Sequence, residues 1–443
     1  MDLFNQTMEE ACHARQIPGA VLVAGNRTGS FKYARCFGAS SLEDECRPMK
    51  MESTMWMASC TKLLTSIAVM QCVEKGLLVL DGDVTTVLPE VKEIPILLGF
   101  DENNGGEPIL KKREKVMTLR HLLTHSSGMS YNIFNPLLKR YQAQHDNGKD
   151  NTGDKESPRR NEIPIVKKYA YPLVFEPGEG WEYSVGLDWA GQMGKLSLLQ
   201  LQVPLVQAST NRVERQTSLT LDQYFQTYIF TPLGIRDHLT FHPLDHPSVS
   251  ANLCKVSWRH GGVNKFGATD NPTGVCEPTT RVFWDARTRQ DHGGSGIFGD
   301  VASYFAVLEA VVKGDEQILT AATWKAMFTP QLEGPAREKL NRLRRIEEIN
   351  NAFGAMDMDV TADWGLGGIL NLSSLKSGRN PCSMAWGGYP NLTWWVDPTE
   401  GIAGIFGSQL CPPGDPQTKK LSREWERTCY AEERARRGEV SRL

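Results

Sequence analysis

The sequence lacks the cysteine and histidine spacings by which proteins bind zinc. Its ten cysteines are scattered, no two of them form a Cys-x-x-Cys pair, and none lies in a cluster with histidine. No phosphate-binding loop, dinucleotide-binding fingerprint or His-Glu-x-x-His motif occurs either. We therefore expect no metal and no cofactor. Any catalysis would then depend on the protein's own side chains.

Long apolar runs and a strong excess of one charge are also missing. No run is long enough for a membrane-spanning helix, and the first residues lack the basic start and apolar core of a signal peptide. Lysine and arginine number 49 against 52 acidic residues, a net charge of −3. This balance favours neither nucleic acid nor a membrane as a partner. With unclustered cysteines, we expect a cytoplasmic protein whose thiols are reduced.

The most informative stretch is Ser59-Cys60-Thr61-Lys62, which opens a long apolar segment. Residues three positions apart lie on one face of a helix, so this spacing places the lysine beside the serine hydroxyl. A neighbouring amine is one of the few groups that activate serine without histidine. The other common arrangement, a Gly-x-Ser-x-Gly elbow, is absent because Gly296 is followed by Ile297.

Taken alone, the pair also has an ordinary structural explanation. Ser59 would cap the helix N-terminus, and Lys62 would extend from the helix end into water. The segment after Lys62 is apolar on nearly all faces, which predicts a core helix ending near Gly76. An unpaired lysine in such a helix would be costly, so the surrounding motifs must decide between the two interpretations.

Strand and helix patterns recur at both ends of the chain. The longest polar stretch, residues 144–162, predicts a flexible loop. The other expected elements are a helix over 2–15, hairpin strands at 20–24 and 31–37, short helices and turns over 77–125, hairpin strands at 391–396 and 401–406, and a charged helix over 421–437.

Strands at both termini with helices between them predict an α+β fold. One antiparallel sheet, flanked by helices, would be built from both ends of the chain, with a mostly helical region inserted. We expect residues 1–50 and 251–443 to form the discontinuous sheet domain and residues 51–250 to form the helical one.

Two further motifs give the Ser-x-x-Lys pair its meaning. A Pro177-Gly178 turn leads to Tyr183, which is followed by an apolar helix, so a phenol is presented from a loop. Near the C-terminal hairpin stands Trp386-Gly387-Gly388-Tyr389. Glycines on a strand allow another group to approach the backbone closely.

Together the three motifs resemble those of the serine β-lactamase, penicillin-binding protein and esterase superfamily, closest to the class C β-lactamase and esterase type. Within it, the chain is most similar to fungal transesterases typified by the lovastatin acyltransferase. Supporting stretches stand in the family's order at residues 122–128, 230–235, 293–298, 386–395, 404–409 and 412–415.

The resemblance implies a β-lactamase-like fold and a covalent mechanism. Ser59 would be the nucleophile, and Lys62 with Tyr183 would remove and relay its proton. Backbone N–H groups of Ser59 and Tyr389 would form the oxyanion hole. Substrate would lie along the strand that contains Trp386, Gly387 and Gly388.

Two departures from the family's motifs bear on the substrate. Val185 stands where the tyrosine motif of β-lactamases has an asparagine, which removes an amide that grips substrate amides. Trp386 stands where their strand motif has lysine, which removes the usual anchor for a substrate carboxylate. Both changes favour an apolar acyl ester or thioester over a β-lactam or peptide.

The resemblance therefore implies an acyltransferase. It would move an acyl group from a thioester donor, either coenzyme A or a polyketide synthase acyl carrier protein, to an alcohol of a secondary metabolite. The same site would serve an esterase, thioesterase or β-lactamase-like hydrolase. A non-catalytic scaffold is the third alternative, and the joint presence of Ser59, Lys62 and Tyr183 argues against it.

Four other features of the sequence have interpretations that do not involve catalysis. His125 is expected to be structural, and Trp394 and Trp395 are expected in the sheet core. The basic runs 111–113 and 344–345 are expected to be solvated, with docking of an acidic carrier protein as the lesser alternative. Residues 194–212 interrupt a stretch that relatives would continue as one helix, which indicates an unusual insert or a mistaken gene model.

Overall fold

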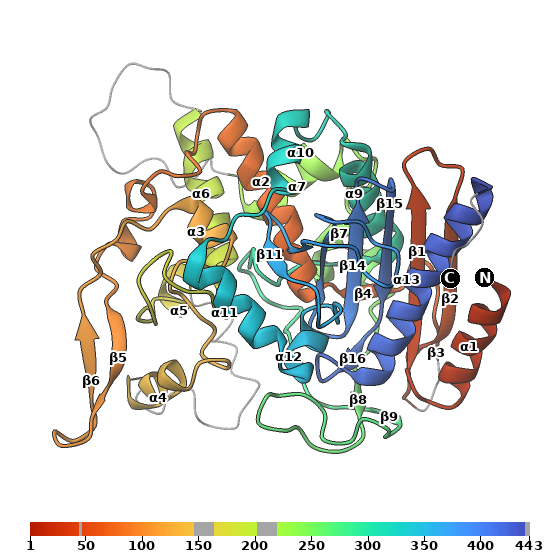
Figure 1. Cartoon of the computed structure of the whole chain (residues 1–443), viewed down its shortest axis with the longest axis horizontal. Coiled ribbons are helices and arrows are strands. Elements are labelled where there is room, and N and C mark those ends of the chain that lie inside the picture. The colour runs from red at the N-terminus through yellow and green to blue at the C-terminus, as the bar shows by residue number, and fades with distance from the viewer. Residues whose placement is uncertain (44–46, 146–163, 202–218, 439–443) are drawn as a thin grey trace.

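An eight-stranded antiparallel sheet forms the centre of the molecule (Figure 1). The computed structural model describes residues 1–43, 47–145, 164–201 and 219–438. The sheet order is β11-β12-β13-β14-β15-β1-β2-β3, so strands from the two ends of the chain meet in the middle. This confirms the predicted α+β fold. The strands are β1 (Gly19–Asn26), β2 (Lys32–Ser41), β3 (Arg47–Pro48), β11 (Ala362–Trp364), β12 (Ile369–Asn371), β13 (Met384–Gly388), β14 (Leu392–Asp397) and β15 (Ile402–Gly407).

The middle strands β1, β14 and β15 are buried throughout because helices cover both faces of the sheet. Every residue of β1 is buried. Neighbouring residues of a strand point to opposite faces. On one face Gly407 packs against Val301 of α9 (Val301–Lys313), and on the other Phe406 packs against Trp425 of α13 (Pro416–Arg436). A strand buried on both sides has a continuous apolar sequence, as residues 20–24 of β1 do.

The first and last helices lie side by side at one edge of the molecule (Figure 1). The amino group of Met1, which precedes α1 (Asp2–His13), donates to Glu432 Oε1 of α13 at 2.7 Å. The predicted C-terminal helix is confirmed, but it begins earlier, at Pro416. The Asp415 carboxylate caps it by accepting from the backbone N–H of Thr418 at 2.8 Å.

Beside the sheet, α2 (Thr61–Glu74) is a core helix whose residues are buried from Thr61 to Cys72. It packs on α6 (Gly186–Leu201).

None of the helices in the described ranges is long and apolar enough to cross a membrane. The two-domain division stays a prediction. The remaining elements are β4 (Thr54–Trp56), η1 (Ala58–Cys60), β5 (Ile96–Asp101), β6 (Glu107–Lys111), α3 (Leu119–Leu123), α4 (Pro136–His145), α5 (Ile165–Lys168), α7 (Leu221–Phe225), β7 (Leu239–Thr240), α8 (Pro247–Ser250), β8 (Ser257–Arg259), β9 (Cys276–Pro278), β10 (Phe298–Asp300), α10 (Ala321–Met327), α11 (Gly334–Arg344), α12 (Glu347–Ala352) and β16 (Leu410–Cys411).

Three segments differ from expectation or lie outside the description. Within 77–125, β5 and β6 form a hairpin that projects from the body (Figure 1), where only helices and turns were predicted. Its exposed Leu98 and Ile109 hide the alternation by which strands are recognised. The predicted loop 144–162 lies outside the described residues beyond His145. Helix α6 runs to Leu201, into the interrupting stretch 194–212, whose later residues are also not described.

The prediction that Arg344 is solvated is wrong. Only 3% of this residue is exposed, and its guanidinium donates to the backbone oxygens of Val360 at 2.8 Å and Asp357 at 3.0 Å. Burial lowers the pKa of Arg344 to about 10. A pair of adjacent arginines looks like a surface run in sequence, but the chain around Asp357 folds back over this one and supplies acceptors.

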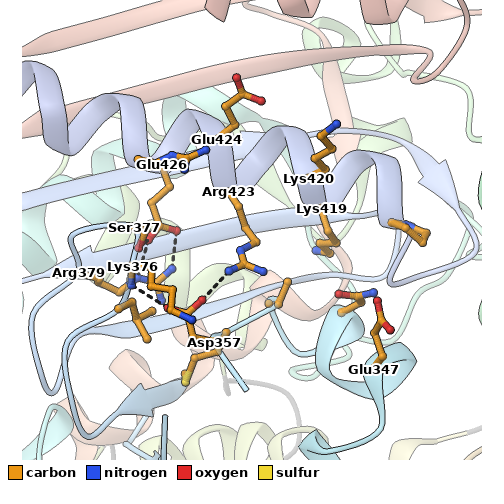
Figure 2. A pocket seen from close by; sticks show the side chains of 17 residues that line it. Glu347, Asp357, Lys376, Ser377, Arg379, Lys419, Lys420, Arg423, Glu424 and Glu426 are labelled. Atoms are coloured by element: carbon orange, nitrogen blue, oxygen red, sulfur yellow. Dashed lines mark hydrogen bonds and ion pairs between the residues drawn. The ribbon is translucent and has the colours of Figure 1, made fainter. Parts of the chain in front are cut away.

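A charged cavity of about 360 Å³ lies between α13, α12 and the loop around residue 377 (Figure 2). Two of the acidic residues that line it are paired with arginines that also line it. Glu426 accepts from Arg379 at 2.6 Å, and Asp357 accepts from Arg423 at 2.6 Å. Lys419 borders the same cavity but is only 4% exposed, and its Nζ donates to Thr393 Oγ1 of β14 at 2.7 Å. None of the residues predicted to be catalytic lines this cavity.

Lys419 makes stability depend on pH. Burial lowers its pKa to about 8, whereas the unfolded chain holds the proton to about 10.4. Between these values the unfolded state binds more protons, so the free energy of unfolding should rise with pH. We expect Lys419→Met to melt several degrees above the wild type at pH 7, with the gap shrinking by pH 10. Melting curves of both proteins across this range test it, and a gap that widens with pH would contradict it.

Candidate active site

Ser59 lies in a tight turn between strand β4 and helix α2. This turn, η1, begins at Ala58, whose φ of +47° is in the left-handed region. Such a conformation costs a non-glycine residue about 1–2 kcal/mol, and such strain clusters at functional sites. The hydroxyl of Thr61 donates to Ala58 O at 2.6 Å and accepts from Ile297 N at 3.1 Å, which fixes the turn. Cys60, not Ser59, holds the N-cap position of α2, so the capping interpretation of Ser59 is wrong.

Lys62 is buried, with only 2% of it exposed. Its ammonium has three N–H donors and three acceptors. It donates to Gly294 O at 2.6 Å, Tyr131 OH at 3.2 Å and Ser59 Oγ at 3.3 Å. The alternative of a lysine extending into water is therefore wrong.

Tyr183 reaches the same serine oxygen from the loop before α6. Its hydroxyl donates to Ser59 Oγ at 2.6 Å, a distance typical of strong O–H···O bonds. The Lys62 ammonium lies 4.6 Å from the centre of the Tyr183 ring. On the far side, the indole N–H of Trp386 donates to the Tyr183 hydroxyl at 3.3 Å. Lys62 and Tyr183 thus both donate to Ser59 Oγ, and Trp386 holds the Tyr183 hydroxyl.

The glycines at the end of β13 allow this strand to touch the serine turn. A side-chain carbon on Gly388 would lie 2.5 Å from Met57 O, and one on Gly387 would lie 2.1 Å from Leu392 O. Neither distance is tolerable, so only glycine permits the approach. Tyr389 follows at once, with its ring centre 6.0 Å from that of Trp56. The structure therefore brings Trp386, Gly387, Gly388 and Tyr389 beside the Ser59 turn.

Further groups support Lys62 from behind, and their roles were not predicted from the sequence. Asp188 Oδ1 accepts from the backbone N–H of Gly294 at 3.0 Å, which fixes the carbonyl that faces Lys62. His292 Nδ1 lies 3.5 Å from the same carboxylate. Burial, and then the negative charge of Asp188, hold the pKa of Tyr131 well above its usual range, so its phenol stays protonated.

Only Asp188 and Gly294 carried a signal in the sequence. Both lie in stretches that resemble family motifs, the tyrosine motif and residues 293–298. Tyr131 lies just outside the stretch 122–128 and in no motif itself, and its contact with Lys62 joins residues 69 positions apart.

His125 lies behind Tyr183 and not at the serine. It is fully buried, and its Nδ1 accepts from the backbone N–H of Ser184 at 3.2 Å. Burial holds the pKa of His125 well below its usual range, so the ring is neutral. Its centre is 4.8 Å from those of Tyr183 and Trp364. This geometry agrees with the structural interpretation of His125.

Aromatic side chains surround the reactive groups. Phe134, which is 51% exposed, and Phe353 lie 6.2 Å from the Tyr183 ring between ring centres. Trp394 and Trp395 are buried in the sheet core, as interpreted. Among the residues that the structure describes, no three His, Cys, Asp or Glu side chains are grouped so that they could hold a metal ion.

Comparison with known proteins gives consistent matches over nearly the whole chain. A sequence profile of the β-lactamase family matches residues 4–200. Monacolin J acid methylbutanoyltransferase of Aspergillus terreus is 35% identical over 97% of this chain and 95% of that protein. Lovastatin esterase of Penicillium rubens is 31% identical over 92% of this chain and 93% of that protein.

The fold is also similar to that of a solved structure over nearly the whole chain. Unliganded simvastatin synthase from Aspergillus terreus superposes with a TM-score of 0.82 at 33% identity. The superposition covers 97% of this chain and 98% of that one.

The geometry predicts that Ser59 is unusually nucleophilic. A fluorophosphonate probe should label it, with the serine oxygen bonding to phosphorus and fluoride leaving. We expect Lys62→Met and Tyr183→Phe each to slow labelling about 100-fold or more, since each removes a group that handles the serine proton. Intact mass against time measures the rate, and Ser59→Ala is the blank. His125→Gln is the matched control, and labelling lost only in that variant would contradict the assignment.

Proposed function

The chain belongs to the β-lactamase-like family of serine acyltransferases and esterases, and on that premise we propose that it transfers an acyl group through an ester on Ser59. The donor is a thioester, and the acceptor is an alcohol of a secondary metabolite. The observation that carries this proposal is the convergence of Lys62 and Tyr183 on Ser59 Oγ, at 3.3 Å and 2.6 Å.

In the first half-reaction Ser59 Oγ attacks the donor carbonyl carbon. The serine proton passes to the member of the Lys62–Tyr183 pair that is deprotonated, either the lysine amine or the tyrosine phenolate. The carbon–sulfur bond breaks, and the pair returns the proton to the leaving thiolate. Either group of the pair can hold the proton, so no order of transfer between them is assigned.

In the second half-reaction the acceptor hydroxyl attacks the acyl-Ser59 carbonyl. The pair takes the alcohol proton and returns it to Ser59 Oγ as the ester bond to serine breaks. No group is consumed, because the second step reverses the proton movements of the first.

We assign the oxyanion hole to the backbone N–H groups of Ser59 and Tyr389. The contact of Gly388 with Met57 supports this, because it places the residue after the glycines at the serine turn. Losing one such donor costs about 3–4 kcal/mol of transition-state stabilisation.

The groups around Tyr183 favour an apolar acyl chain. Where β-lactamases have a cationic lysine, Trp386 offers a neutral N–H that is already donated to Tyr183. Val185, at the asparagine position, is 4% exposed and adds no polar group. A charged or peptide-like substrate would leave its own polar groups unpaired here.

Hydrolysis at the same site is the second candidate. Water could replace the alcohol without any other change in mechanism, and one relative that covers nearly the whole chain is named an esterase. The two reactions differ only in how well water is kept from the acyl-enzyme.

We also propose the setting of the reaction. The donor is carried by coenzyme A or by an acyl carrier protein of a polyketide synthase. The nine cysteines in the described part of the chain are all free thiols, which supports a reducing, cytoplasmic location.

Incubation with butyryl thioesters tests the covalent step. Intact-mass spectrometry should show a butyryl adduct on the wild type and none on Ser59→Ala. Adding a panel of polyketide alcohols should then discharge the adduct to esters faster than water does. Turnover of thioesters without any adduct in wild-type protein trapped by acid would contradict the covalent mechanism, and butyrate as the sole product would favour the hydrolase.

Gly388→Ala tests the assigned oxyanion hole. The added carbon clashes with Met57 O, so β13 must move away from the serine turn and carry the Tyr389 N–H with it. We expect kcat for acylation to fall about 100-fold, in line with the loss of one donor. Gly378→Ala, a glycine packed on Tyr430 of α13, controls for general damage to the fold. Equal activity losses in the two variants would overturn the assignment.

A further inference from the structure

A row of aromatic rings leads from the serine turn to an exposed arginine. The Trp56 ring, three residues before Ser59, lies 6.0 Å from Tyr389, and Tyr389 lies 6.0 Å from Phe283 between ring centres. Phe283 stacks on Trp258 at 5.8 Å with an angle of 8° between the rings. The guanidinium of Arg281 lies 4.0 Å from the centre of the Trp258 ring.

Arg281 is positioned but not neutralised. Stacking on Trp258 holds the guanidinium in place, and its N–H donors form no ion pair or hydrogen bond with any residue that the structure describes. Other arginines in this part of the fold have carboxylate partners. Arg259 is bound to Asp415 at 2.7 Å, and Arg289 to Asp245 at 2.5 Å.

The positive charge of Arg281 reaches the side chain of Tyr389. Burial raises the pKa of Tyr389 to about 12, and the positive charge of Arg281 opposes that rise. Arg281 is therefore close enough to the Tyr389 phenol to act on an anion that lies along the same row of rings.

Two of the basic residues first considered for a carrier, Lys111 and Arg344, do not offer such a free charge. Lys111 is paired with Glu114 at 3.0 Å and with Glu176 at 3.4 Å. Arg344 is buried and bound to backbone oxygens. The strand position where relatives of the β-lactamase type hold a cation is occupied by Trp386.

We propose that Arg281 binds the phosphate of a phosphopantetheinyl thioester donor, whose arm lies along Phe283 and Tyr389 with its thioester at Ser59. The inference rests on the proposed function. It fits a donor whose anion is separated from its reactive carbonyl by a long neutral chain, because the cation and the serine stand at opposite ends of the aromatic row. Arginine's planar fork suits a phosphate, and coenzyme A and a carrier protein present the same arm.

A pair of donors isolates the phosphate. Butyryl-phosphopantetheine and butyryl-pantetheine carry the same thioester and arm and differ only in the phosphate. We expect the wild type to prefer the phosphorylated donor about tenfold in kcat/KM for Ser59 acylation, and Arg281→Ala to lose that preference while keeping its rate with butyryl-pantetheine. Arg281→Lys should keep part of it, and added salt should reduce it.

Arg289→Ala is the matched control. Arg289 is also exposed, lies eight positions further along the same segment and carries the same charge, but does not stack on the aromatic row. Its removal should leave the preference unchanged, whereas an equal loss there would show a general charge effect and overturn the proposal.

The remaining outcomes separate the inference from the proposed function. If Arg281→Ala slows both donors equally, or weakens only the alcohol acceptor, the phosphate subsite is wrong and acyl transfer stands. If neither donor acylates Ser59 in the wild type, the proposed function itself fails. Repeating the comparison with butyryl-coenzyme A and a butyryl-loaded carrier protein tells which source the site serves, and a preference in neither would also count against Arg281.

Discussion

A buried ammonium is the constraint on which the rest of the site depends. A charge with almost no exposed surface is costly to bury unless every donor finds an acceptor. Lys62 meets this condition only because Gly294, Tyr131 and Ser59 stand around it. Asp188 in turn holds the Gly294 segment. The positions of the serine turn, the tyrosine loop and the 293–298 segment are therefore coupled, and the polar lining that stabilises the fold also prepares the nucleophile.

Features that depend on contacts between near neighbours in the sequence were predictable. Features that depend on contacts between residues far apart in the sequence were not predictable from local rules. Helix geometry relates Ser59 to Lys62 across three positions, and continuous apolar runs revealed the central strands. Tyr183 and the Trp386–Tyr389 stretch needed the family resemblance, because no local rule brings them to Ser59. Tyr131 was invisible, since its role arises only from long-range packing. Arg344 was misjudged because charge alone predicts exposure, whereas the neighbouring backbone supplies its acceptors.

Trp386 shows how one substitution changes a site without dismantling it. A cation at this strand position would attract anionic substrates. The indole keeps a single donor, gives it to Tyr183, and fills the remaining space with apolar surface. Together with Phe134 and Phe353, it surrounds the Tyr183 ring with aromatic surface where a cation would otherwise stand.

The pairing of β1 with β15 has a consequence for folding during synthesis. The strand that completes the middle of the sheet is made last, after nearly the whole chain has left the ribosome. Until then the apolar β1–β2 hairpin has one open edge, and the serine turn lacks the glycine strand that belongs beside it. Contacts between residues far apart in the sequence slow folding. They also prolong the time during which unpaired apolar strand edges are exposed. The serine turn therefore cannot take its final surroundings until strands β13 to β15 have been made and have paired.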